Sequence, residues 1–536
     1  MDGIDRTEGK GTRSEGMQTF KRAALVCAAA TTAIVAVSSP RARAATYYIA
    51  TSADGGSDSN SGAIGSPFAS INKAASVALP GDTVFVRGGT YNFNAVQSIG
   101  SSRSGTAAAP IKLFANPGDA SPVVLDFRGE TFSSSNSGAR GIQLDASYWH
   151  VKGLTVQYAA DNGILVSGSN NTLERLVTRQ NQDSGVAIQS SGGRTPSNNL
   201  VLNCDSYGNF DYGPTAGPHG ENADGFVAKF RGLGPGNTFV GTRAFNNGDD
   251  GYDFWAAESG VTMIGCQSFH NGNIASPARV FRTAANGAIS NFAGDGNGYK
   301  LGHDSGTHTI RNSLAWGNQV NGFDINGNAL SIEVPATPIA HGATIFNSTS
   351  YKNGGQNFQF DEAFAHVLAN DISVTGTTNI DGTVVRTSDV FTGLTAADFQ
   401  SLADPVTDGI FHPAGTGADR SSTTSPTYPI VPLRDADGNL PFMSFLHLAA
   451  TSSLIDAGVI TFTDATGQTV TLTSSGQVLH FTGVDVTIPG YNGARPDLGA
   501  FETTVPEPAS FIAAGAIAGV RLIKRRSRAS TARVRN

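Results

Sequence analysis

Five charged residues lie in three copies of a short repeated motif and are candidates for chemistry: Asp224, Asp249, Asp250, Asp253 and Lys300. If neighbouring repeats stack, the four carboxylates face one another and repel strongly in a partly desolvated site. A hard dication with oxygen ligands removes that repulsion, and flexible, carboxylate-rich coordination favours Ca²⁺ over Mg²⁺. The alternative is turn capping, because Asp before Gly is common in turns. The pattern predicts a calcium site beside one amine.

The motif is a glycine preceded by Asp, Asn or Ser and followed by apolar, variable and apolar residues. Its six copies lie 22 to 47 residues apart, at Gly163, Gly185, Gly225, Gly251, Gly298 and Gly322. These steps are one or two coils of roughly 22 residues with added loops. The repeat predicts an all-β, single-domain right-handed parallel β-helix (a solenoid) with an N-terminal capping helix.

Strand alternation places the residues one and three after each glycine inside the solenoid and the residue between them outside. The outside position reads Leu165, Ala187, Val227, Asp253, Lys300 and Asp324. If the coils of Gly251 and Gly298 are adjacent, Asp253 and Lys300 lie about 4.8 Å apart along the axis. A second pattern, an aromatic residue two before an Asn, predicts an amide ladder with the aromatic rings stacked inside.

Composition narrows the function classes. The formal net charge is −7, only 15% of residues are charged and 65 residues are Gly. An acidic chain is a poor nucleic-acid binder. It binds an acidic polysaccharide only if a cation intervenes.

Both ends are predicted to be targeting segments. Lys21 and Arg22 precede an apolar run and a small-x-small cleavage site, so residues 1–44 are predicted to be a secretory signal peptide. Residues 505–536 resemble a PEP-CTERM sorting tail, with Val505-Pro506-Glu507-Pro508, an apolar stretch and a basic cluster. The resemblance implies recognition by sorting machinery at the inner membrane and a secreted or cell-surface location. A membrane anchor at either end is the alternative, but both runs are short.

The remaining residues, 45–504, are predicted to form the solenoid: 45–100 the cap and first coil, 141–360 the central coils with the site, 361–504 the C-terminal coils and loops. Ser70 is expected to cap a helix through Ala78, followed by the first strand at Thr83–Val86. The repeats fade after Asp361, where Ser453–Gly458 and Asp497–Glu502 are expected as closing strands and Thr461–Val486 as an inserted hairpin.

Cys204 and Cys266 precede comparable segments two coils apart. That spacing separates them by about 9.6 Å, beyond the roughly 7 Å limit for a disulfide. We expect both to be reduced and buried.

Several segments resemble polysaccharide lyase family nine, the parallel-β-helix pectate lyases: ENADGF from Glu221, NNGDDGYD from Asn246, GNGYKLG from Gly296, NSLAWGNQVNGFDIN from Asn312, and the later SLIDAG and PDLGAFE. The resemblance implies that the matching Asp224, Asp249, Asp250 and Asp253 bind calcium and that Lys300 is the base. The implied reaction is β-elimination in pectate (polygalacturonate), an acidic plant-type polysaccharide, by an enzyme that we expect to be a monomer.

Alternatives remain at this stage. A rhamnogalacturonan lyase of the same fold is one alternative, which the sequence does not decide. Gly248-Asp249-Asp250 imitates a polygalacturonase motif, but the other segments of that hydrolase are missing. A non-catalytic adhesin is a third alternative, in which Lys300 is a surface lysine. Lys229, Arg231 and Arg279 are expected to be solvated surface residues rather than substrate contacts, and Asp324 is expected to be structural or substrate-side.

Overall fold

The computed structural model describes residues 44–131, 139–212, 219–272, 281, 289, 291–302, 306–326, 342–361, 364–411 and 426–503. The chain divides into two compact units, Met1–Arg43 and Ala44–Asn536. The predicted signal peptide, apart from Ala44, and the sorting tail lie outside the described residues, as does Arg279. No described helix is long and apolar enough to cross a membrane.

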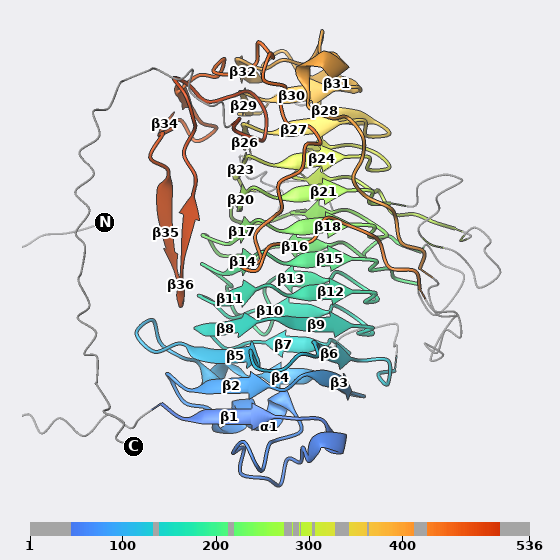
Figure 1. Cartoon of the computed structure of the whole chain (residues 1–536), viewed down its shortest axis with the longest axis vertical. Coiled ribbons are helices and arrows are strands. Elements are labelled where there is room, and N and C mark those ends of the chain that lie inside the picture. The colour runs from blue at the N-terminus through green and yellow to red at the C-terminus, as the bar shows by residue number, and fades with distance from the viewer. Residues whose placement is uncertain are drawn as a thin grey trace, which may run out of the picture. The chain divides into compact units, whose positions relative to one another are not determined.

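The Ala44–Asn536 unit is a right-handed parallel β-helix, as predicted, in which three parallel sheets run the length of the stack (Figure 1). We call the first the groove sheet. Its strands are β1 (Thr46–Ile49), β2 (Thr83–Val86), β5 (Ile111–Ala115), β8 (Trp149–Lys152), β11 (Thr172–Glu174), β14 (Leu200–Leu202), β17 (Thr238–Val240), β20 (Thr262–Ile264), β23 (His308–Arg311), β26 (Ala343–Phe346), β29 (Val367–Ala369) and β32 (Val385–Thr387).

The second, the site sheet, carries the repeated glycine motif. Its strands are β4 (Gln97–Ile99), β7 (Ile142–Leu144), β10 (Ile164–Val166), β13 (Val186–Ile188), β16 (Phe226–Ala228), β19 (Tyr252–Asp253), β22 (Tyr299–Lys300), β25 (Phe323–Asp324), β28 (Gln356–Phe360) and β31 (Thr377–Ile380). The third, the strap sheet, contains β3 (Gly89–Asn92), β6 (Val123–Asp126), β9 (Leu154–Gln157), β12 (Val177–Arg179), β15 (Asp205–Tyr207), β18 (Arg243–Phe245), β21 (Gln267–Phe269), β24 (Leu314–Trp316), β27 (Thr349–Tyr351) and β30 (Ile372–Val374).

The cap is formed by helix α1 (Ile71–Val77) at the N-terminal end of the stack, where it contacts β1 and β4 (Figure 1). Ser70 accepts a hydrogen bond from the Lys73 backbone N–H, as expected of an N-cap. The strand Thr83–Val86 is confirmed as β2, but it is not the first, because β1 precedes it in the same sheet.

The predicted amide ladder is confirmed at the turn between the strap sheet and the site sheet. Side-chain amides hydrogen-bond from each coil to the next at 2.9–3.0 Å, through Asn181, Asn209, Asn247, Asn271, Asn318 and Asn353. Within the last of these coils the Asn353 amide bonds to Asn357 at 3.0 Å. Because each amide satisfies its neighbour, the buried turn leaves few polar groups unpaired. The ladder holds successive coils in register.

The placement of the ladder's aromatic residues inside the solenoid is wrong. Tyr207, Phe245, Phe269 and Trp316 do stack, with ring centroids 4.2–4.8 Å apart, but they lie on the outer face of the strap sheet. They pack under residues 388–411 and 426–503, which we call the C-terminal strap (Figure 1). Inside, a different stack follows the site sheet: Phe226, Tyr252, Tyr299, Phe323 and Phe358.

The coils continue past Asp361 as far as β32. The segments Ser453–Gly458 and Asp497–Glu502 are not closing strands: both are irregular parts of the strap. They bond to each other, Leu498 N–H donating to the Leu454 carbonyl at 3.1 Å, rather than to a sheet edge. The expected insertion contains two hairpins, β33–β34 (Thr461–Thr463, Thr469–Thr471) and β35–β36 (Gln477–Phe481, Val484–Ile488).

Cys204 and Cys266 are free and buried, as predicted. They precede β15 and β21, which are separated by β18 in the strap sheet. Burial raises the pKa of the Cys204 thiol to about 12. Both cysteines therefore act as packing residues.

Candidate metal and catalytic site

An acidic triad lies at the N-terminal ends of adjacent strands of the site sheet. Asp224 precedes β16, and Asp249 and Asp250 precede β19; the pairing of Val227 with Asp253 confirms that the two coils are neighbours. Carboxylate oxygens of the three aspartates lie within 4.8 Å of one another, and all three residues are buried. The described part of the chain thus contains a compact, oxygen-rich group that could hold a metal ion.

Turn capping and metal binding turn out to be compatible, because each aspartate has two oxygens. Oδ1 of Asp224 accepts the Asp250 N–H at 3.1 Å, and Oδ1 of Asp250 accepts the Asn297 N–H at 2.6 Å. Oδ1 of Asp249 likewise accepts the Asp295 N–H at 2.6 Å. Oδ2 of Asp250 is buried without a hydrogen-bond partner, although the Lys300 ammonium lies 3.3 Å away. In each aspartate Oδ1 fixes the turn. Oδ2 of Asp224 accepts from Ser184 Oγ at 3.1 Å and from Lys229, so Oδ2 of Asp250 is the oxygen most clearly left for a cation.

Burial and mutual repulsion disfavour the charged forms of the triad's carboxylates. Burial, and next the neighbouring carboxylate of Asp250, raise the pKa of Asp249 well above its usual range. Burial also raises the pKa of Asp250 well above its usual range, against the opposing effect of Lys300, and raises that of Asp224 to about 6. A hard dication would compensate these charges, so the donor set fits the predicted calcium ion.

Lys300 projects from the outer face of the site sheet, as predicted. Its neighbours Tyr299 and Leu301 belong to the interior core, whereas Lys300 pairs in register with Asp253 on one side and Asp324 on the other. The ammonium lies 2.8 Å from Asp295 Oδ2, and the side chain is 11% exposed. Burial alone would lower the pKa of Lys300, but Asp250 and its acidic neighbours outweigh burial and raise it well above its usual range.

The expectation that Lys229 is a solvated surface lysine is wrong. Its side chain is 13% exposed, and its ammonium lies 3.2 Å from Asp224 Oδ2 and 2.8 Å from Asp253 Oδ2. Lys229 stands one position beyond the end of β16, so its long side chain reaches sideways to the next coil. Sequence reasoning missed it because the motif ends before residue 229.

Asp253 stands apart from the triad. Its Oδ1 accepts the Trp255 N–H at 2.8 Å, and its Oδ2 accepts from Lys229. Burial would raise its pKa, but Lys229 and Lys300 outweigh burial and lower it. The structure therefore gathers three of the four predicted ligands within 4.8 Å and holds the fourth on Lys229.

Two further carboxylates were not anticipated. Asp295 caps the Lys300 amine from the coil turn and is 54% exposed. Asp183 occupies the same motif position as Asp249, two residues before the glycine. Burial and the nearby Asp161 raise the pKa of Asp183 to about 7. That shared motif position was the signal that could have revealed Asp183. Asp324, expected to be structural or substrate-side, accepts from the Asn321 side chain and the Asn326 N–H.

Comparisons with known proteins agree with this architecture. A family described as "Pel9A-like, right handed beta helix region" matches residues 47–376. Pectate lyase L of Paenibacillus polymyxa (strain SC2) is 34% identical over 413 residues, covering 72% of this chain and 79% of the relative. Pectate lyase L of Dickeya dadantii (strain 3937) is 32% identical over 471 residues, covering 85% and 90%.

Among solved structures, the crystal structure of pectate lyase Pel9A gives a TM-score of 0.62 at 31% identity, covering 86% of this chain and 97% of that one. A rhamnogalacturonan lyase structure gives a TM-score of 0.55 at 23% identity and covers 76% and 96%, which supports the fold alone. The chain therefore belongs to the Pel9A-like right-handed β-helix family, which is polysaccharide lyase family nine, the family that its motifs resemble.

Proposed function

We propose that this chain is a calcium-dependent pectate lyase in which Lys300 is the base of a β-elimination. The observation that carries the proposal is the juxtaposition of the Lys300 amine with the acidic triad on adjacent strands of one outer face. Membership of a family whose relatives carry the name pectate lyase supports the substrate class.

The metal would be held by Asp224, Asp249 and Asp250, with Asp253 completing the set if its oxygen leaves Lys229. When bound, Ca²⁺ would neutralise the aspartates, attract the C6 carboxylate of a galacturonate unit and acidify its C5 proton. This also explains how an acidic protein binds an acidic polymer.

Lys300 carries out the proton transfer in this proposal. The neutral amine takes the C5 proton onto Nζ, the C5 electron pair forms the C4=C5 double bond, and the C4–O4 bond breaks. The departing O4 takes a proton from water. Asp295, 2.8 Å from Nζ on the more exposed side, orients the amine.

An ultraviolet assay of the unsaturated product on polygalacturonate, rhamnogalacturonan and methylated pectin tests the proposal. We expect calcium-dependent release from polygalacturonate, loss of that release with a chelator, and loss in Lys300→Ala. New reducing ends without unsaturated product would identify a hydrolase. Product from rhamnogalacturonan alone would reassign the substrate. No product from any polymer, with polymer binding unchanged in Lys300→Ala, would support an adhesin.

We further propose that the enzyme is exported through residues 1–44, sorted through residues 505–536, and monomeric. The sequence signals at both ends support export and sorting. N-terminal sequencing of the mature protein should find Ala45 first, and light scattering should give one chain per particle. A mature protein that starts at Met1 contradicts export.

A further inference from the structure

A large groove lies away from the acidic triad, on the outer face of the groove sheet. It has a volume of about 1110 Å³ and is lined by groove-sheet strands on one side and by the two hairpins and the end of the strap on the other. Val486 and Ile488 of β36 pack on Leu200, Val240 and Ile264, which anchors the second hairpin along the groove. The walls are therefore part of the folded core.

Arg311, at the end of β23, carries the unpaired charge of this groove. Among the described residues no carboxylate lies within 4 Å of its guanidinium, and its single side-chain hydrogen bond is a long one, 3.4 Å, to Gln477 Oε1. Burial lowers the pKa of Arg311, with no acid to oppose the effect. A half-buried guanidinium whose donors are mostly unused by the protein is suited to a carboxylate, which it binds in a bidentate fork.

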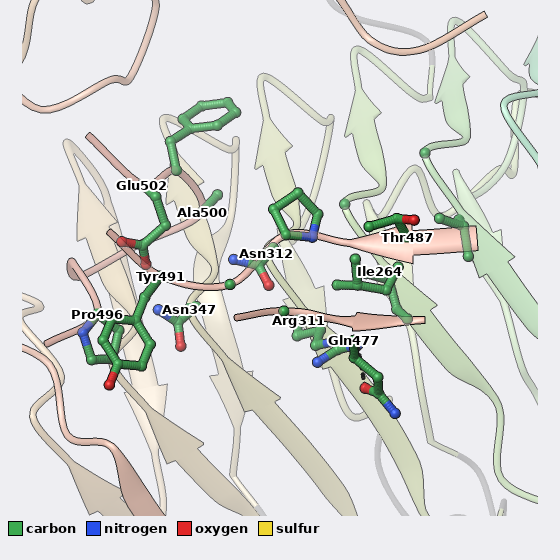
Figure 2. A pocket seen from close by; sticks show the side chains of 18 of the residues that line it. Ile264, Arg311, Asn312, Asn347, Gln477, Thr487, Tyr491, Pro496, Ala500 and Glu502 are labelled. Atoms are coloured by element: carbon green, nitrogen blue, oxygen red, sulfur yellow. Dashed lines mark hydrogen bonds between the residues drawn. The ribbon is translucent and has the colours of Figure 1, made fainter. Parts of the chain in front are cut away.

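The other lining groups suit a sugar chain. Figure 2 shows Arg311 and Gln477 toward one end of the groove, Tyr491 and Glu502 toward the other, and Asn312 between them. The Asn312 side chain makes no hydrogen bond to any described residue, and the Tyr491 ring stacks on no described ring, so an amide and an aromatic face are available. Hydrogen-bonding amides and an amphipathic ring are groups that recognise hydroxyls and the apolar face of a sugar.

One acid bounds the groove. Glu502 accepts the N–H groups of Asn492 and Asp497 at 3.2 Å. Burial, and next Asp497, raise its pKa to about 7. The Glu502 carboxylate is therefore directed at backbone N–H groups of the strap, whereas Arg311 makes the opposite end of the groove positively charged.

We propose that this groove is a second, non-catalytic binding site for a uronate-bearing oligosaccharide, with Arg311 receiving a sugar carboxylate. The site sheet and the groove sheet are different faces of each coil, so a polymer strand bound in the groove does not occupy the catalytic face. The choice of galacturonate as ligand rests on the proposed function. The groove would retain substrate on the enzyme between cleavage events.

Calorimetric titration with saturated tetragalacturonate tests this, using Lys300→Ala protein in chelator so that cleavage and the calcium site are silent. We expect binding to weaken about tenfold in Lys300→Ala/Arg311→Ala and less in the Arg311→Lys double variant, which keeps charge but loses the fork. Arg87→Ala is the matched control, because Arg87 follows β2 of the same sheet and pairs with Asp119 outside the groove. Circular dichroism melts confirm that each variant is folded, and Gln477→Ala offers a milder change at an exposed residue of the groove.

Equal affinity of the Arg311 variants and their parent overturns the inference, as does equal binding of a neutral galactose tetramer or of sulfate. An equal loss in Arg87→Ala also overturns it. The two proposals fail separately. Wild-type protein that releases no unsaturated product refutes the lyase, while Arg311-dependent uronate binding still stands. Intact lyase activity without Arg311-dependent binding refutes only the groove.

Discussion

The Lys229 ammonium lies 2.8 Å from Oδ2 of Asp253, and the same ammonium reaches Oδ2 of Asp224 at 3.2 Å. A cation of the protein thus stands between two of the four aspartates that the sequence assigns to calcium. In the proposed enzyme a calcium ion would compete with this ammonium for the same oxygens, so Lys229 would weaken the binding of the metal.

We predict that Lys229→Met strengthens calcium binding by roughly tenfold, equivalent to about 1.4 kcal/mol. The substitution keeps the length of the side chain and removes its repulsion toward a dication. Titration calorimetry with Ca²⁺ measures the change, and Lys352→Met is the control because Lys352 is an exposed lysine outside the site. Weaker calcium binding in Lys229→Met would show that holding Asp253 in place matters more than the repulsion.

Lys300→Ala should lower kcat by about 10²- to 10⁴-fold, the usual contribution of a general base. Calcium affinity should not fall, because the substitution removes a positive charge next to Asp250. Lys300→Arg should be as inactive as the alanine variant, since a guanidinium stays protonated. Rates are followed by the unsaturated product, and an active arginine variant would argue against proton abstraction at residue 300.

The rate should rise with pH. The acidic neighbours raise the pKa of Lys300, so the neutral amine is scarce at neutral pH and increases about tenfold per pH unit. Saturating Ca²⁺ opposes these acids and should move the profile toward lower pH. Measurement of kcat/KM against pH at several calcium concentrations checks both statements. A flat profile would be inconsistent with a lysine base.

Stability without calcium should fall as pH rises. The folded-state pKa values of Asp249 and Asp250 lie above their unfolded values, so the folded state binds more protons and is favoured at low pH. Their contribution is lost as pH rises through the folded pKa. Melting temperatures in chelator should therefore decline from mildly acidic to neutral pH, and excess Ca²⁺ should remove the decline. Asp250→Asn should reduce both effects.

The C-terminal strap should be held to the coils by a contact whose strength depends on pH. His270 faces two strap carboxylates, with Nε2 2.7 Å from Asp404 and Nδ1 2.5 Å from Asp408. Burial lowers its pKa, but the two acids outweigh burial and raise it to about 9. A raised histidine pKa stabilises the fold below the unfolded value of about 6.5 and loses that effect as pH passes about 9.

His270→Ala should therefore lower the melting temperature at neutral pH, and the difference from wild type should shrink above pH 9. His480→Ala is the matched control, because His480 pairs with Asp485 on an exposed hairpin. Thermal melts over pH 6 to about 10 decide the matter. A deficit that is constant with pH would mean that the packing of His270, rather than its charge, holds the strap.

The positions of site residues could be predicted from the sequence where strand geometry determines them. Alternation with a period of two fixes which side chains leave the sheet, so the adjacency of Asp253 and Lys300 follows once the glycines are aligned. The position of Lys229 does not follow, because four rotatable side-chain bonds let it cross to the neighbouring coil. The same limit hid Asp295, which approaches Lys300 from a turn.

The prediction of closing strands in what is now the strap also failed, for a different physical reason. Ser453–Gly458 and Asp497–Glu502 look like the closing strands of a solenoid in sequence, yet they bond to each other and cover aromatic rings on the outer face. Aromatic residues such as Tyr207, Phe245 and Phe269 give the same sequence pattern whether the interior of a coil or the strap buries them. Hydrophobic periodicity predicts which residues are buried, but it does not predict on which side of a sheet they are buried.

The amide ladder has a consequence for how this enzyme could diversify. Asn271 bonds to Asn318 at 2.9 Å, and Asp253 pairs with Lys300, although 46 residues separate the latter two in the chain. Strand pairing and the side-chain hydrogen bond between Asn271 and Asn318 set the spacing of these coils, whatever the length of the segment that joins them. A longer or shorter joining segment therefore leaves Asp253 and Lys300 at the same separation, so this part of the chain can change in length without moving the proposed catalytic amine.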